Sequence, residues 1–149
     1  MLNALLSQIP KEEPDLKIGS LGLWVSGYTA ENQMEQGDLA YLTTPTLLVT
    51  AEVVIFSSKS DTSLFDFRNF LNDIKKMYAN ISDRHVVEFS SRESEFSLTL
   101  TNNDLGHIII DINYYAWTHD CQFEFEDVID QTYLPSIIGS LEVILNRFR

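Results

Sequence analysis

The sequence predicts an α+β fold in which one antiparallel sheet of about six strands is covered by two amphipathic helices. The second half of the chain contains four segments of alternating apolar and polar residues joined by short turns, a pattern typical of antiparallel strands. Two further segments place apolar residues at steps of three and four, so each predicts a helix with one face to bury. The length of 149 residues and the apolar content of 44% suit a single domain over residues 1–149.

The first half of the chain predicts less regular strands. Residues 1–15 combine a short apolar segment with two prolines, and we expect an N-terminal entry arm there. Residues 16–28 alternate imperfectly around three glycines, which predicts one strand with a bulge or bend. Residues 29–44 hold few large apolar side chains and predict a loop or a short second strand. Residues 46–56 are largely apolar on both faces, so we expect a long central strand covered on both sides.

Apolar periodicity predicts the two helices. The first begins near residues 60–63, where Ser, Asp and Thr are N-cap candidates. Its predicted buried stripe consists of Leu64, Phe67, Leu71, Ile74, Tyr78 and Ile81. In the second helix, Thr132 is the expected N-cap and Pro135 lies in the first turn, where its missing N–H is harmless. Its predicted stripe consists of Leu134, Ile137, Ile138, Leu141, Ile144, Leu145 and Phe148.

Four strands between the helices are expected to form a meander with one polar face. Their predicted bounds are residues 86–90, 95–101, 107–115 and 121–128, with a hairpin turn at 102–106. The predicted partner-binding residues on or beside the polar face are Glu95, Asp111, Tyr115, Trp117, Glu124 and Glu126. Neighbouring carboxylates repel one another unless a cation arrives, so such a face suits an Arg or Lys of a partner. A solvated sheet face explains the same pattern without any partner.

The distribution of charge leaves the same two interpretations open. The formal net charge is -12, and residues 93–146 contain ten acidic residues and no Lys or Arg. A one-sided acidic surface attracts and orients a basic protein, although acidity can also serve solubility alone. Direct binding of nucleic acid is disfavoured, because the only basic clusters are Lys75 with Lys76 and Arg147 with Arg149.

Catalytic and metal sites have little support in the sequence. Glu124 and Glu126 are about 7 Å apart along a strand, a spacing that occurs in glycosidases and on any exposed strand. His107 with Asp111, and residues 119–121, supply metal-ligand types without the spacing of a dedicated site. The single cysteine lies in that run and has no base on an independent element. We therefore expect no enzyme activity, no cofactor and no metal.

The sequence also bears on localisation. One cysteine cannot form an internal disulfide, and the N-terminus lacks the basic region of a secretory signal. No apolar run approaches the roughly 18 residues of a membrane span. We expect a cytoplasmic protein that binds neither membrane nor nucleic acid.

The segment from residue 117 to residue 141 carries a longer motif. Its elements are Trp117, Phe123, Phe125 and Glu126, then Asp-Gln-Thr-Tyr-Leu-Pro at residues 130–135, then Ile137, Ile138 and Leu141. This segment resembles the end of the WapI-like immunity proteins of bacterial polymorphic toxin systems, whereas the first half of the chain is similar to them in layout alone. The turn at residues 130–135 is explained by a capped helix start and marks no binding residue.

The resemblance implies a non-catalytic protein that binds and neutralises the C-terminal domain of a cognate toxin. In that family the toxin is often a nuclease, and an acidic inhibitor is the natural complement of a basic nuclease. The other hypothesis is a small-ligand-binding or regulatory domain of the same fold, which would require an enclosed apolar pocket.

Overall fold

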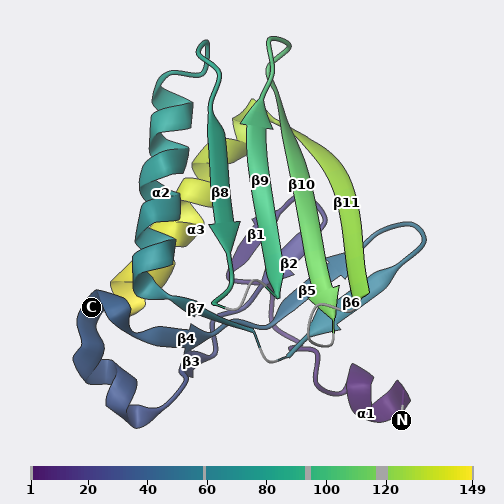
Figure 1. Ribbon diagram of the computed structural model, residues 1–149, viewed down its shortest axis with the longest axis vertical. Helices are drawn as coiled ribbons and strands as arrows, with labels where there is room; N and C mark the ends of the chain where they lie inside the picture. The colour runs from purple at the N-terminus through teal and green to yellow at the C-terminus, as the bar shows by residue number, and fades with distance from the viewer. Residues whose placement is uncertain (1, 59, 93–94, 117–120, 149) are drawn as a thin grey trace.

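The computed structural model describes residues 2–58, 60–92, 95–116 and 121–148 (Figure 1). This described part has the predicted α+β fold, with eleven strands and three α-helices. The prediction of one six-stranded sheet is wrong, because the strands form three antiparallel sheets. The difference arises in the first half of the chain, where turns divide segments that the sequence pattern presents as continuous strands.

The second half of the chain forms the predicted meander, in the order β11-β10-β9-β8. Its strands are β8 (Val86–Ser90), β9 (Phe96–Asn102), β10 (His107–Ala116) and β11 (Cys121–Asp130). In the predicted turn between β9 and β10, Asn103 Oδ1 accepts hydrogen bonds from the N–H groups of Leu105 and His107 at 2.9 and 3.1 Å. Gly106 completes the turn with φ +79°, a conformation that favours glycine.

A second sheet has the order β1-β2-β5-β6. Its strands are β1 (Leu16–Ile18), β2 (Leu21–Leu23), β5 (Thr46–Val49) and β6 (Val54–Ser57). The long central strand predicted over residues 46–56 is wrong, because the chain reverses between β5 and β6. Thr50 Oγ1 accepts hydrogen bonds from the N–H groups of Glu52 and Val53 at 3.3 and 3.0 Å and so stabilises the turn. The valines on either side of the turn are exposed, so the hairpin tip is not covered on both sides.

The third sheet is small and has the order β3-β4-β7. Its strands are β3 (Gly27–Tyr28), β4 (Tyr41–Thr43) and β7 (Asp61–Ser63). Residues 29–44 contain β4, one of the two predicted alternatives, preceded by the 3₁₀ helix η1 (Glu31–Leu39). The single bent strand predicted over residues 16–28 is wrong, because this segment is divided among β1, β2 and β3. Gly19, with φ +57°, allows the reversal between the first two.

The α-helices are α1 (Leu2–Leu6), α2 (Leu64–Ala79) and α3 (Leu134–Arg147). Ser63 is the N-cap of α2, and its hydroxyl accepts a hydrogen bond from the Asp66 N–H at 3.1 Å. The predicted apolar stripe faces the core except for Tyr78, which is exposed, whereas Phe70 and Met77 are buried. The stripe of α3 is confirmed, with its residues buried or packed against the core.

The start of α3 differs from its prediction in the capping residue. Tyr133, and not Thr132, is the N-cap residue of α3, and it makes no side-chain capping hydrogen bond. Before the helix, the Asp130 carboxylate accepts a hydrogen bond from the Thr132 N–H at 2.9 Å. This bond lowers the pKa of Asp130. A 3₁₀ turn, η2 (Gln131–Tyr133), lies between Asp130 and α3, and Pro135 occupies the first turn of the helix as predicted.

In Figure 1, α3 passes behind the meander and α2 stands beside β8, and both helices contribute to the core that covers the buried face of the meander. Phe70 of α2 stacks on Phe89 of β8 with 4.5 Å between the ring centroids. Tyr114 of β10 donates its hydroxyl to Thr46 Oγ1 of β5 at 2.8 Å and so links the two larger sheets. Burial raises the pKa of Tyr114 to about 12. The helices thus leave the opposite face of the meander without cover from any described element.

Candidate protein-binding face

The meander has one buried and one exposed face, because side chains alternate along each strand. In β9 the alternation is complete, with every second residue from Phe96 to Asn102 buried. We call the exposed face the outer face. Cross-strand pairing aligns its side chains in rows that run across the four strands. The first row, which we call the acidic row, consists of Glu88, Thr99, Asp111 and Glu126.

A second polar row lies beside the acidic row. It consists of Ser90, Ser97, Asn113 and Glu124. At its β11 end, Gln122 Nε2 donates a hydrogen bond to Glu124 Oε1 at 2.9 Å. None of the four strands contains a Lys or Arg, so the described outer face has carboxylates without a cationic side chain of its own.

The structure brings together three of the predicted partner-binding residues. Asp111 is directly opposite Glu126, and Glu124 is opposite Asn113; all three carboxylates are exposed. Directly opposed like charges destabilise a sheet unless a cation lies between them. The pairing therefore leaves Asp111 and Glu126 suited to accept an Arg or Lys from outside the chain.

Two other predicted residues lie at the end of the outer face. Tyr115 donates its backbone N–H to the Glu95 carbonyl at 2.9 Å, and both residues are half-buried. Tyr115 is opposite Gln122 on β11. The sixth predicted residue, Trp117, lies outside the described residues.

An apolar row borders the acidic row on its other side. It consists of Val86, Thr101, Ile109 and Val128. Val86 and Val128 are 61% and 50% exposed, well above what a core valine shows. Exposed apolar groups beside charged ones are typical of protein interfaces, where apolar contact supplies affinity and charge supplies orientation. This row is not among the predicted partner-binding residues, although Val86 and Val128 have the same alternation as their acidic neighbours.

Not every acid of the 93–146 stretch is available to a partner. Asp127 lies on the other side of β11 from Glu126, and its Oδ2 accepts hydrogen bonds from the N–H and hydroxyl of Ser20 at 2.7 and 2.8 Å. Glu142 pairs with Lys75 at 3.0 Å, and Asp130 caps the chain before α3. These three acids have structural roles that net charge alone does not reveal.

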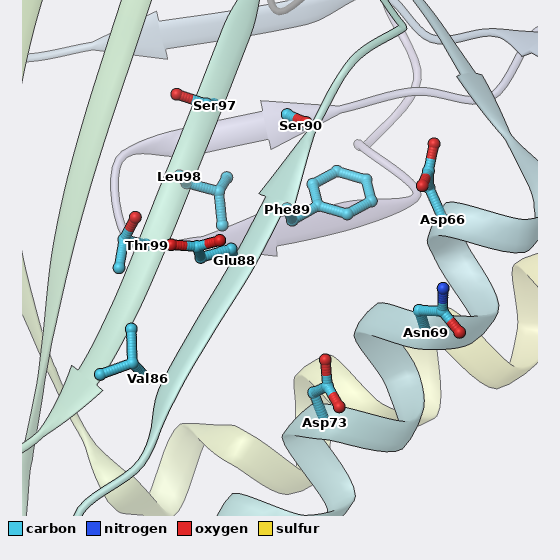
Figure 2. A pocket seen from close by; sticks show the side chains of 10 residues that line it. All are labelled: Asp66, Asn69, Asp73, Val86, Glu88, Phe89, Ser90, Ser97, Leu98 and Thr99. Carbon is cyan, nitrogen blue, oxygen red and sulfur yellow. The ribbon is translucent and has the colours of Figure 1, made fainter.

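Two open grooves border the rows. One, of about 370 Å³, runs between β10 and β11, and its walls include Asp111, Glu124 and Glu126. The other, of about 740 Å³, lies between α2 and β8 (Figure 2). Its acidic side chains come from two elements, Asp66 and Asp73 on α2 and Glu88 on β8. The α2 residues of this second groove are not among the predicted partner-binding residues, although the spacing of Asp66, Asn69 and Asp73 predicts one helix face.

The geometry gives little support to a metal site. In the part of the chain that the structure describes, no three His, Cys, Asp or Glu side chains are placed so that they could hold a metal ion together. His119, Asp120 and the side chain of Cys121, which the sequence offers as ligands, lie outside that part.

Comparison with known protein families identifies the family of this chain. The profile of the WapI-like immunity protein family matches residues 16–149. The chain belongs to the WapI-like immunity protein family. The match confirms the resemblance seen at residues 117–141 and extends it over the first half of the chain. No curated protein and no solved structure matches this WapI-like chain.

The described helices of this WapI-like protein can be compared with what a membrane-spanning helix requires. None of them combines the length and the apolar character that a membrane crossing needs.

Proposed function

We propose that this protein is a non-catalytic immunity protein that binds and neutralises a cognate toxin domain, a basic nuclease, through the outer face of the meander. The observation that carries the proposal is the pair of polar rows, which present Asp111, Glu124 and Glu126 on one uncovered surface with no Lys or Arg among them. Its setting is the cytoplasm of the cell that produces the toxin, where the protein acts by stoichiometric binding.

The physical basis is complementarity of charge. A nuclease that holds phosphate groups needs clustered cations, and the net charge of -12 attracts such a surface. Carboxylates on strands can form two parallel hydrogen bonds with a guanidinium group, and the backbone that carries them is already ordered by strand pairing. Val86 and Val128 supply apolar contact beside them, and Tyr115 and Trp117 are the expected aromatic anchors. A toxin so covered cannot bring its phosphate-binding groove to nucleic acid.

The other hypothesis, a small-ligand-binding or regulatory domain, needs an enclosed apolar pocket with a few converging polar groups. The grooves at the two ends of the acidic row are open and lined largely by polar groups. Their shape favours a protein surface over a small molecule.

The test is to express this protein together with the product of the neighbouring upstream gene. We expect the C-terminal domain of that product to co-purify with this protein and to kill cells that lack it, and we expect this protein to restore growth. A neighbour that neither binds nor kills would contradict the proposal and favour the ligand-binding hypothesis.

A further inference from the structure

The outer strand β8 has an unpaired backbone edge beside the groove shown in Figure 2. The Ser91 N–H donates to the Phe96 carbonyl at 3.1 Å, which fixes the phase of hydrogen bonding between β8 and β9. Because bonded and non-bonded pairs alternate in an antiparallel ladder, the N–H and C=O groups of Val86, Glu88 and Ser90 point away from β9. Among the described residues, none of the three has a backbone hydrogen bond outside the strand pairing. Such an edge is a template for another strand.

The helix α2 runs along this edge, and the charged α2 side chains that line the groove are all acidic. Asp66, Asn69 and Asp73 line the α2 side of the groove, and Glu88 lines the β8 side. None of the lining residues is Lys or Arg. Asp66 also accepts a hydrogen bond from the Ser63 hydroxyl at 2.9 Å, whereas Asn69 is exposed and Asp73 is half-buried.

We infer that the groove between α2 and β8 receives an extended segment of the toxin domain, which adds a strand to β8 and carries Lys or Arg at alternate positions. This inference rests on the proposed function and names how part of the toxin is bound. Along α2, Asp66 and Asp73 are about 10 Å apart by helical rise. Cations two residues apart on a strand are about 7 Å apart, and their long, flexible side chains can span the difference between this spacing and that of the two carboxylates.

The acidic charge of the groove favours a basic segment of the toxin over a second copy of this chain as the occupant. Pairing two β8 edges would bring Glu88 and the α2 carboxylates of each copy together, in a chain with net charge -12. The opposite edge of the meander is less open to a strand, because the Asp127 carboxylate accepts the Val128 N–H at 2.9 Å. No described helix stands beside β11 to form a second wall there.

Proline substitution isolates the backbone contribution. Glu88→Pro removes the outward N–H and keeps the ladder bonds to β9, whereas Glu88→Ala removes only the carboxylate. With the co-purified toxin domain, we expect Glu88→Pro to bind at least tenfold more weakly than Glu88→Ala, with the circular dichroism spectrum unchanged. Asp73→Lys, on the α2 wall of the groove, should weaken binding at least tenfold without any change to β8. Binding within twofold of wild type for both Glu88→Pro and Asp73→Lys would overturn the inference and leave the proposed function standing.

A peptide tests the groove even if no toxin complex forms. The probe is the blocked peptide TKVRVKT, titrated into ¹⁵N-labelled protein, with TEVEVET and a TKVRVKT peptide N-methylated at both valines as controls. We expect the amide signals of Val86, Glu88 and Ser90 to shift with the first peptide and not with either control. Absence of these shifts at millimolar peptide, or equal shifts over β10 and β11, would overturn the inference.

Discussion

The two neighbouring acids Glu126 and Asp127 on β11 should respond differently to the same substitution. Asp127 Oδ2 accepts two hydrogen bonds from Ser20 at 2.7 and 2.8 Å in a part-buried position, which ties the β1–β2 turn to the meander. Hydrogen bonds to a charged group contribute about 1.5–3 kcal/mol each, and partial exposure places the sum for Asp127→Ala near 3 kcal/mol. Glu126 is exposed, so Glu126→Ala should change the free energy of unfolding by less than about 0.5 kcal/mol.

Urea unfolding at pH 7 measures the difference, and thermal unfolding repeats it. For a chain of this length, a loss of about 3 kcal/mol lowers Tm by about 6–12 °C. Ser20→Ala removes one of the two donors and should cost about 1 kcal/mol, and its effect should not add fully to that of Asp127→Ala. Equal stability of Asp127→Ala and Glu126→Ala, or full additivity with Ser20→Ala, would refute the assignment of Asp127 to structure.

Three further predictions concern stability. Asn102 is buried and makes three hydrogen bonds to the loop before β8, from the His85 N–H and to the carbonyls of Ile81 and Asp83; Asn102→Ala should cost about 2–4 kcal/mol in urea unfolding, and a loss below 0.5 kcal/mol would contradict this account. Gly19→Ala should destabilise by about 1–2 kcal/mol, because φ is +57° and the new methyl group meets the Asp127 carboxylate. Gly139→Ala, in open space on α3, should stabilise by about 0.5–1 kcal/mol. Equal effects of the two substitutions in thermal unfolding would contradict this prediction. The pKa of Tyr114 is raised to about 12 from 10.0, so the folded state keeps the phenol proton to a higher pH and stability should fall as the pH rises from 10 to 12. Tyr114→Phe should show a shallower fall in unfolding experiments over the same range. Identical pH profiles of the two proteins would contradict the burial of this phenol.

The sequence predicts the meander and the long helices well because their signals are local. Alternation over β9 and β10 leaves one register that buries the apolar face, and the stripe of α3 has only one face to bury. The hairpin of β5 and β6 is hidden because its turn depends on the Thr50 hydroxyl and not on Gly or Pro. The division of residues 16–28 is hidden because Gly19 is compatible with both a bend and a full reversal.

The candidate site, like the fold, can be predicted from the sequence only in part. The alternation of β10 and β11 is enough to group Asp111, Glu124 and Glu126 on one face. It cannot separate Glu126 from Asp127 by role, because the partner of Asp127 is Ser20, 107 positions away in the chain. The groove beside β8 depends on how α2 packs against that strand, which no local pattern specifies.

The most direct test of the central claim is the affinity of the toxin domain for a charge-reversed outer face. Glu124→Lys combined with Glu126→Lys is compared with Glu31→Lys combined with Glu35→Lys, an exposed acidic pair on η1 that changes net charge equally. Isothermal titration calorimetry should show a loss of about 100-fold or more for the first pair and less than about fivefold for the second. Equal affinities of the two double variants would mean that the outer face of the meander is not where the toxin binds.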